Sequence, residues 1–140
     1  MNELLAYAIL LCEGIVSDEI FNARLDEMFM KKPNDKLLLD LECTGDAEKA
    51  AASLRANFDY TKLDKVLFGR TMMKELREYC RLYGVTKQFG EKMYLLWESL
   101  PDCVQDEEPF SVFTYADDPL SWGDEQQSRE IYEKALDYYD

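Results

Sequence analysis

The longest periodic segment of the chain is TKLDKVLFGRTMMKELREYCRLY, which runs from Thr61 to Tyr83. Its apolar residues recur at spacings of three, four and seven, which is the pattern of one helical face. The predicted buried side consists of Val66, Met73, Leu76, Cys80 and Tyr83. Gly84 is a typical helix stop. The segment therefore predicts a long amphipathic helix.

Two helices are predicted on the N-terminal side of this segment. Residues 2–16 carry one apolar stripe of Leu4, Leu5, Ala8, Leu11, Cys12 and Ile15. Ser17 is the expected N-cap of a second helix that ends at Lys31-Lys32-Pro33. The apolar residues of that helix are Ile20, Phe21, Leu25, Met28 and Phe29. A link this short predicts an antiparallel helical hairpin.

Residues 34–44 are ambiguous, because their leucines fit either a short helix or a strand. Asn34 or Asp35 as a cap, and the lack of a partner strand, favour the helix. Asp46 is the expected cap of an alanine-rich helix, AEKAAASLRANF.

On the C-terminal side, Thr86 caps a helix that ends before Pro101, and a last helix starts near Asp124. The apolar residues of these two helices are Phe89, Met93, Leu96, Trp97, Ile131, Ala135, Leu136 and Tyr139. The prediction is an all-α fold. It is a single compact domain over 1–140, with six or seven helices in antiparallel hairpins and one long irregular loop at about 101–123.

The negative charge is concentrated near the C-terminus. The formal net charge is −13, but residues 1–100 hold 17 acids against 14 bases, a net of −3. Residues 101–140 hold 12 acids against two bases, Arg129 and Lys134, a net of −10. Such a surface repels nucleic acid and anionic lipid and attracts a basic partner. The alternative interpretation is a solvated face with a frayed acidic tail.

Catalytic and metal-binding motifs are absent from the sequence. The chain has no histidine, phosphate-binding glycine loop or serine hydrolase elbow. The adjacent pairs Glu107–Glu108 and Asp117–Asp118 lie in an acidic segment where no difference in pKa is expected. The run ADDPLSWGDE lacks the spacing of a calcium loop. The prediction is a protein that is not an enzyme, with no cofactor and no metal.

The cysteines and the first apolar run indicate the cellular compartment of the protein. The four cysteines form no C-x-x-C pair, and Cys12, Cys43 and Cys80 are expected to be reduced core residues. The run Leu4–Cys12 is too short to span a membrane, and no basic residue precedes it. A cytoplasmic protein that does not bind membranes or nucleic acid, and is monomeric when free, is expected.

Two surfaces remain as candidate binding sites. The first is a basic stripe on the long helix, formed by Arg70, Lys74, Arg77 and Arg81. The second is QDEEPFSVFTYADDPLSWGDE at 105–125, which combines seven carboxylates with four aromatic rings. These rings could all pack into the core. Alternatively, Phe110 and Phe113 anchor the segment while Tyr115 or Trp122 faces a partner.

Carboxylates interleaved with Tyr and Trp, at DEE 106–108, YADD 115–118 and SWGDE 121–125, resemble the small acidic immunity proteins of bacterial toxin–immunity pairs. The resemblance lies in composition and covers about a sixth of the chain. It implies tight binding and inhibition of a basic toxin domain, in some pairs a nuclease. The predicted partner-binding residues are Asp106, Glu107, Glu108, Tyr115, Asp117, Asp118, Trp122, Asp124 and Glu125. The alternatives are a helical adaptor that uses the basic stripe, or an inhibitor that mimics nucleic acid.

Overall fold

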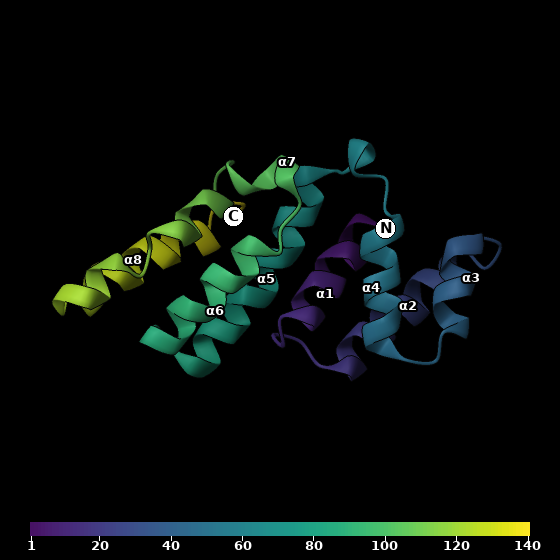
Figure 1. Cartoon of the computed structure of the whole chain (residues 1–140), viewed down its shortest axis with the longest axis horizontal. Helices are drawn as coiled ribbons and strands as arrows, with labels where there is room; N and C mark the ends of the chain where they lie inside the picture. Colours follow the sequence, from purple (N-terminus) through teal and green to yellow (C-terminus); the bar gives the residue numbers. More distant parts are fainter. The chain divides into compact units, whose positions relative to one another are not determined.

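The computed structural model describes all 140 residues and contains only helices (Figure 1). There are eight α-helices, three short 3₁₀ helices (η1–η3) and no strand, so the predicted all-α class is confirmed. The backbone divides into two compact units, residues 1–68 and 69–140, with the boundary inside α5 (Lys65–Tyr83). That residues 1–140 act as one domain stays a prediction.

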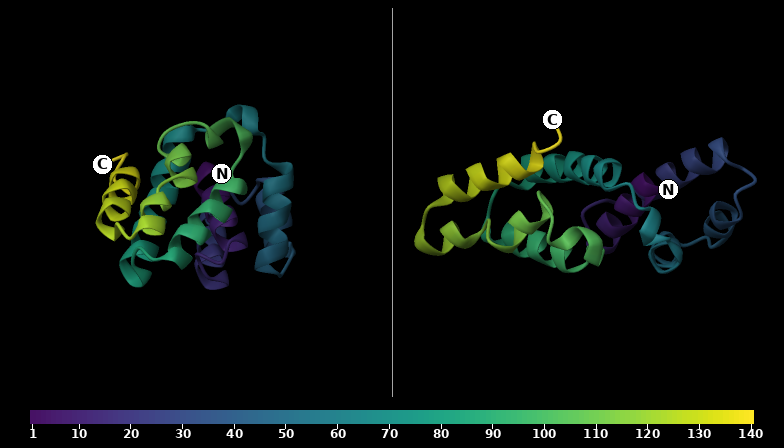
Figure 2. Two further views of the ribbon diagram at one scale, coloured as in Figure 1. Left: turned by 60° about the vertical axis from the view of Figure 1, so that its left-hand side comes forward. Right: turned by 90° about the horizontal axis from the view of Figure 1, so that it is seen from above.

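The first unit is built around its first helix. Its elements are α1 (Asn2–Cys12), α2 (Asp18–Lys31), α3 (Lys36–Cys43), α4 (Ala47–Asn57) and η1 (Tyr60–Lys62). Helices α2 and α4 both pack against α1, and α3 packs against α2 and α4 (Figures 1 and 2). The predicted hairpin of the first two helices is therefore one part of a four-helix cluster.

Helix α1 is buried all around rather than along one stripe. Every side chain from Leu4 to Leu11 is buried, including Tyr7, whereas Cys12 is exposed. A helix that is apolar on all sides is typical of the centre of a core. The prediction of a single stripe was wrong because consecutive apolar residues leave no polar face for solvent.

Side-chain caps fix where the helices of the first unit begin. Ser17, Asp35 and Asp46 each accept a hydrogen bond from the backbone N–H three residues ahead, at 3.3, 3.1 and 3.0 Å. These bonds satisfy N–H groups that have no partner within the helix. Gly45 joins α3 to α4 with a φ of +70°, which glycine adopts without strain. Residues 36–43 are thus helical, and the strand alternative is wrong.

The second unit contains most of α5, followed by α6 (Lys87–Glu98), α7 (Asp102–Gln105), η2 (Phe110–Thr114), η3 (Asp118–Trp122) and α8 (Glu125–Leu136). Thr86 caps α6 by accepting a hydrogen bond from the Phe89 N–H at 3.1 Å. The expectation of an irregular loop at 101–123 was wrong, because α7, η2 and η3 occupy most of it. Pro101, Pro109 and Pro119 stand at the starts of these three turns, where the missing N–H costs nothing.

Helix α5 buries only part of the predicted set. Met73 and Leu76 are buried as expected, Phe68 and Met72 are buried as well, and Cys80 is half-buried. Val66 and Tyr83, which were expected inside, are 52% and 63% exposed. They lie in the first and last turns of the helix, where the apolar periodicity continues in the sequence but few other elements pack against the helix.

Candidate functional site: an acidic and aromatic surface in the second unit

The segment 105–125 is anchored by its two phenylalanines. Phe110 and Phe113 are 1% and 0% exposed, whereas Tyr115 and Trp122 are 48% and 63% exposed. The interpretation in which the Phe side chains point inward and Tyr115 and Trp122 face out is therefore the one found. Both exposed rings lie in the same acidic segment, and this clustering makes the segment a candidate interaction surface.

Tyr132 of α8 is the residue on which this segment packs. Its ring lies 6.2 Å from that of Phe113, and it meets the Phe89 ring edge-on at 4.9 Å. The three rings tie η2, α6 and α8 together. The residues between α7 and α8 run beside α8 as a result (Figures 1 and 2). The sequence reasoning missed Tyr132, although its spacing from the predicted Ala135 and Leu136 fits the same helical face.

A reciprocal pair of hydrogen bonds fixes the start of the segment. The Trp97 indole N–H donates to the Gln105 carbonyl at 2.9 Å, and the Gln105 side-chain amide donates to the Trp97 carbonyl at 3.0 Å. These bonds close the turn between α6 and the acidic residues that follow. The backbone is thus held in place directly before the carboxylates at 106–108.

Of the nine predicted partner-binding residues, eight are exposed: Asp106, Glu107, Glu108, Tyr115, Asp118, Trp122, Asp124 and Glu125. The ninth, Asp117, is half-buried. Its Cβ packs so closely on α6 that a Cβ added at Gly90 would lie 2.6 Å from it. Gly90 is therefore the residue that lets the YADD segment approach α6.

Two of the exposed carboxylates already have roles within the fold. Asp124 caps α8 by accepting a hydrogen bond from the Gln127 N–H at 3.0 Å. Glu125 pairs with Arg129 one turn later at 2.7 Å. Asp106, Glu108 and Asp118 make no ion pair. Their negative charge is available to a partner.

A groove of about 320 Å³ lies between η2 and α8. Its walls come from Glu108, Pro109, Val112, Tyr115, Ile131, Lys134, Ala135 and Tyr138. Two of the predicted residues, Glu108 and Tyr115, thus meet on one concave surface. Tyr138, which is 50% exposed, was not predicted and supplies a second exposed ring there.

Burial and nearby carboxylates act together on two tyrosines, the buried Tyr132 and the half-buried Tyr139. Burial, and after it the carboxylate of Asp117, raise the pKa of Tyr132. Burial raises the pKa of Tyr139 as well, and Glu107 adds to that effect while Arg70 opposes it. Both phenols therefore remain neutral at physiological pH.

The basic stripe on α5 is partly neutralised from within the chain. Arg77 pairs with Asp140 and also lies 3.5 Å from Asp137. Arg81 pairs with Glu78 at 2.8 Å. The stripe is thus a weaker candidate for an anionic ligand than its sequence spacing indicated.

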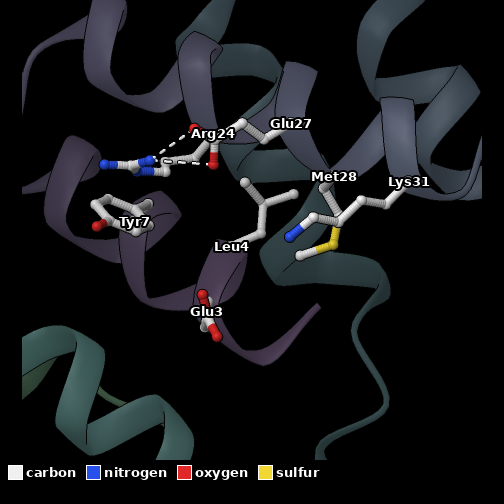
Figure 3. Close-up of a pocket in the computed structure, with 7 residues that line it drawn as sticks. All are labelled: Glu3, Leu4, Tyr7, Arg24, Glu27, Met28 and Lys31. Atoms are coloured by element: carbon white, nitrogen blue, oxygen red, sulfur yellow. Dashed lines mark hydrogen bonds and ion pairs between the residues drawn. The ribbon is translucent and has the colours of Figure 1, made fainter.

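A second candidate lies between α1 and α2, at a cavity of only about 40 Å³ (Figure 3). The Arg24 guanidinium lies 5.5 Å from the centroid of the Tyr7 ring and pairs with Glu27 at 2.9 Å. Figure 3 shows these side chains with Glu3, Leu4, Met28 and Lys31 around them. A cavity of this volume holds water rather than a ligand, so the cluster is structural.

A carboxyl pair in the first unit escaped the sequence reasoning. Burial, and after it the neighbouring carboxyl group of Asp26, raise the pKa of Glu42 to about 7. The two residues line a second groove of about 280 Å³, to which Asp46 also contributes. One carboxyl tuned toward neutrality is a feature of a general acid. However, Asp26 and Glu42 are far apart in sequence, so no local pattern could have revealed them.

No three His, Cys, Asp or Glu side chains converge to form a metal site. The expectations of no metal, no cofactor and no catalysis stay predictions.

The four cysteines are free thiols. Cys12 and Cys43 are exposed, so the assignment of these two residues to the core was wrong. Both lie at the last residue of a helix, beyond the packed turns. None of the helices has the length and apolarity needed to cross a bilayer.

No protein family matches the chain, and no curated protein or solved structure is significantly similar to it.

Proposed function

We propose that this chain is a non-enzymatic inhibitor that binds a basic protein through the acidic and aromatic surface of residues 106–125. A toxin domain neutralised in the manner of an immunity protein is the partner that fits the compositional resemblance. The observation that carries the proposal is the exposure of Tyr115 and Trp122 in the same segment as Asp106, Glu108 and Asp118, which make no ion pair. Exposed Tyr and Trp supply hot-spot energy at interfaces, and the carboxylates select a cationic partner.

The anchoring of the segment supports the same role. Phe110, Phe113 and the Trp97–Gln105 hydrogen bonds hold the backbone in place before any partner arrives. A preorganised surface loses less conformational entropy on binding than a mobile loop does. The intramolecular pairing of Arg77 and Arg81 weighs against the alternative of an adaptor that binds through the basic stripe.

The test is protection in cells. The partner to test is a toxin encoded in a reading frame adjacent to that of this chain and carrying a basic C-terminal domain. That domain should arrest growth when expressed alone and should be harmless when co-expressed with this chain. Truncating Trp122 and Tyr115 together to Ala should weaken protection. Matched exposed residues on the second unit, Tyr83 and Tyr94, serve as the control pair. An adjacent basic domain that stays toxic in the presence of the wild-type chain contradicts the proposal.

A further inference from the structure

The groove between η2 and α8 has an apolar floor and an aromatic rim. Val112, Ile131 and Ala135 line it, and the half-exposed rings of Tyr115 and Tyr138 stand beside them. Its volume of about 320 Å³ is at the lower end of the ~300–1,000 Å³ typical of ligand pockets. Its size suits about one or two large side chains better than a cofactor.

The rim of the groove is supported from below. Tyr138 meets the Tyr139 ring edge-on, with 5.1 Å between the centroids. The Tyr139 ring in turn lies against Gly69 of α5, so closely that no Cβ fits at that position. Tyr138 is thus an exposed ring on a packed base, which is how interface anchors are usually held.

The charge around the groove selects among possible occupants. Glu108 lines it and Asp106 and Glu107 directly precede it, whereas Lys134 is its one basic residue. A second copy of this chain would bring two acidic surfaces, each with a net of −10 over residues 101–140, into contact. Repulsion between them disfavours self-association, and the same field disfavours an anionic lipid.

From the apolar floor, the tyrosine rim and the negative field, we infer that this groove binds a large apolar side chain carried on a lysine- or arginine-rich segment of the partner protein. The inference rests on the proposed function and adds the chemistry of the partner's contacting segment. The apolar side chain replaces water over Val112 and Ile131, and the flanking cations meet Glu108 and the neighbouring carboxylates.

The experiment uses fluorescein-labelled synthetic peptides and the full chain. One peptide is lysine-rich with a single central leucine, a second has alanine in place of the leucine, and a third keeps the leucine but has serines in place of the lysines. Fluorescence anisotropy gives the affinities. The lysine-rich leucine peptide should bind about tenfold tighter than the alanine peptide, since an extra apolar group in a pocket is worth at least that factor.

Variants of the chain locate the contact. Tyr138→Ala and Val112→Thr should each remove the preference for leucine over alanine. Tyr94→Ala is the matched control, because Tyr94 is 42% exposed but does not line the groove, and this variant should retain the preference. Circular dichroism spectra that match the wild type show which variants are folded, and either folded groove variant is sufficient for the comparison.

The outcomes separate this inference from the proposed function. If the two lysine-rich peptides bind equally well, and both weaken when Asp106, Glu107 and Glu108 are neutralised, the groove inference is overturned while the acidic surface stands. If the serine peptide binds as tightly as the lysine-rich leucine peptide, the basic character of the occupant is wrong. If neither lysine-rich peptide binds, the inference and the proposed surface fail together.

Discussion

At the scale of single residues, the second unit holds two buried hydroxyls without a hydrogen-bond partner. Ser128 and Tyr132 are both 0% exposed, and the hydroxyl oxygen of neither is bonded. They lie one turn apart on the buried face of α8. An unsatisfied buried polar group costs about 1–3 kcal/mol. The packing of the Tyr132 ring on Phe89 and Phe113 therefore stabilises the unit in spite of its hydroxyl.

Replacing Tyr132 by Phe should raise the free energy of unfolding by about 1 kcal/mol, because the ring contacts remain while the unsatisfied hydroxyl is removed. Urea titration followed by circular dichroism measures it, with Tyr138→Phe as the exposed control that changes little. A loss of stability of similar size would mean that the hydroxyl makes a bond that the packing depends on.

The exposed and buried aromatic residues of the segment 105–125 should differ sharply on truncation. Trp122→Ala should change the free energy of unfolding by less than about 0.5 kcal/mol, since the side chain is 63% exposed. Phe113→Ala should lower it by about 3–5 kcal/mol, because that ring is fully buried. The same urea titrations compare them. If Trp122→Ala destabilises as much as Phe113→Ala, Trp122 is a core anchor and not part of a binding surface.

At the scale of elements, the contact between α2 and α3 contains a carboxyl group whose pKa is raised to about 7. Glu42 of α3 faces Asp26 of α2, and Asp46 lines the same groove. The raised pKa of Glu42 means that its protonated form is favoured in the folded state. The associated stability is fully present below the ordinary pKa of about 4.5 and is lost as pH rises through about 7.

Glu42→Gln imitates the protonated form at every pH and should therefore remove this dependence. The melting temperature of the wild type should fall relative to that of Glu42→Gln between pH 5 and pH 8, with the two proteins closest at pH 5. Differential scanning fluorimetry at both pH values measures the difference. Asp40→Asn, an exposed neighbour on α3, is the control. Parallel curves for wild type and Glu42→Gln would show that Glu42 ionises normally.

The sequence predicted the helix ends better than the helix faces. Ser17, Asp46 and Thr86 act locally, through a bond to a backbone N–H three residues ahead, so their caps are visible in the sequence. Which side of α1 or α5 is buried depends on the neighbouring helices, and periodicity alone does not contain that information. The error at 101–123 has a different origin, because α7, η2 and η3 are too short to show a helical period in the sequence.

The candidate site was predictable from the sequence only in part. The composition of 105–125 identifies an acidic and aromatic surface, and the exposure of Tyr115 and Trp122 agrees with it. The groove does not follow from the sequence, because Tyr138 and Ile131 reach it only once α8 has packed beside η2.

At the scale of the whole molecule, charge distinguishes residues 101–140 from the rest of the chain. The concentration of a net −10 in residues 101–140 is self-repulsive, and only Arg77 of the basic stripe is seen to pair with carboxylates of that segment. A cationic partner relieves this repulsion on binding, and the same field speeds the encounter. The carboxylates are thus expected to act mainly on the association rate and the exposed rings mainly on the dissociation rate.

The most direct test of the acidic surface is the association rate constant for the proposed partner, a basic toxin domain, measured by stopped-flow fluorescence at low and at physiological salt. Two folded variants are compared with the wild type. In one, Asp106, Glu107, Glu108, Asp117 and Asp118 are changed to Asn or Gln. In the other, the same number of carboxylates is removed from the first unit, at Glu3, Asp18, Glu19, Asp40 and Glu48.

The first variant should associate about tenfold more slowly than the wild type at low salt and should lose most of its salt dependence. The second variant has the same net charge and should stay close to the wild type. Equal rates for the wild type and the first variant, or equal slowing of both variants, would contradict the claim that the acidic and aromatic surface of residues 106–125 binds the partner.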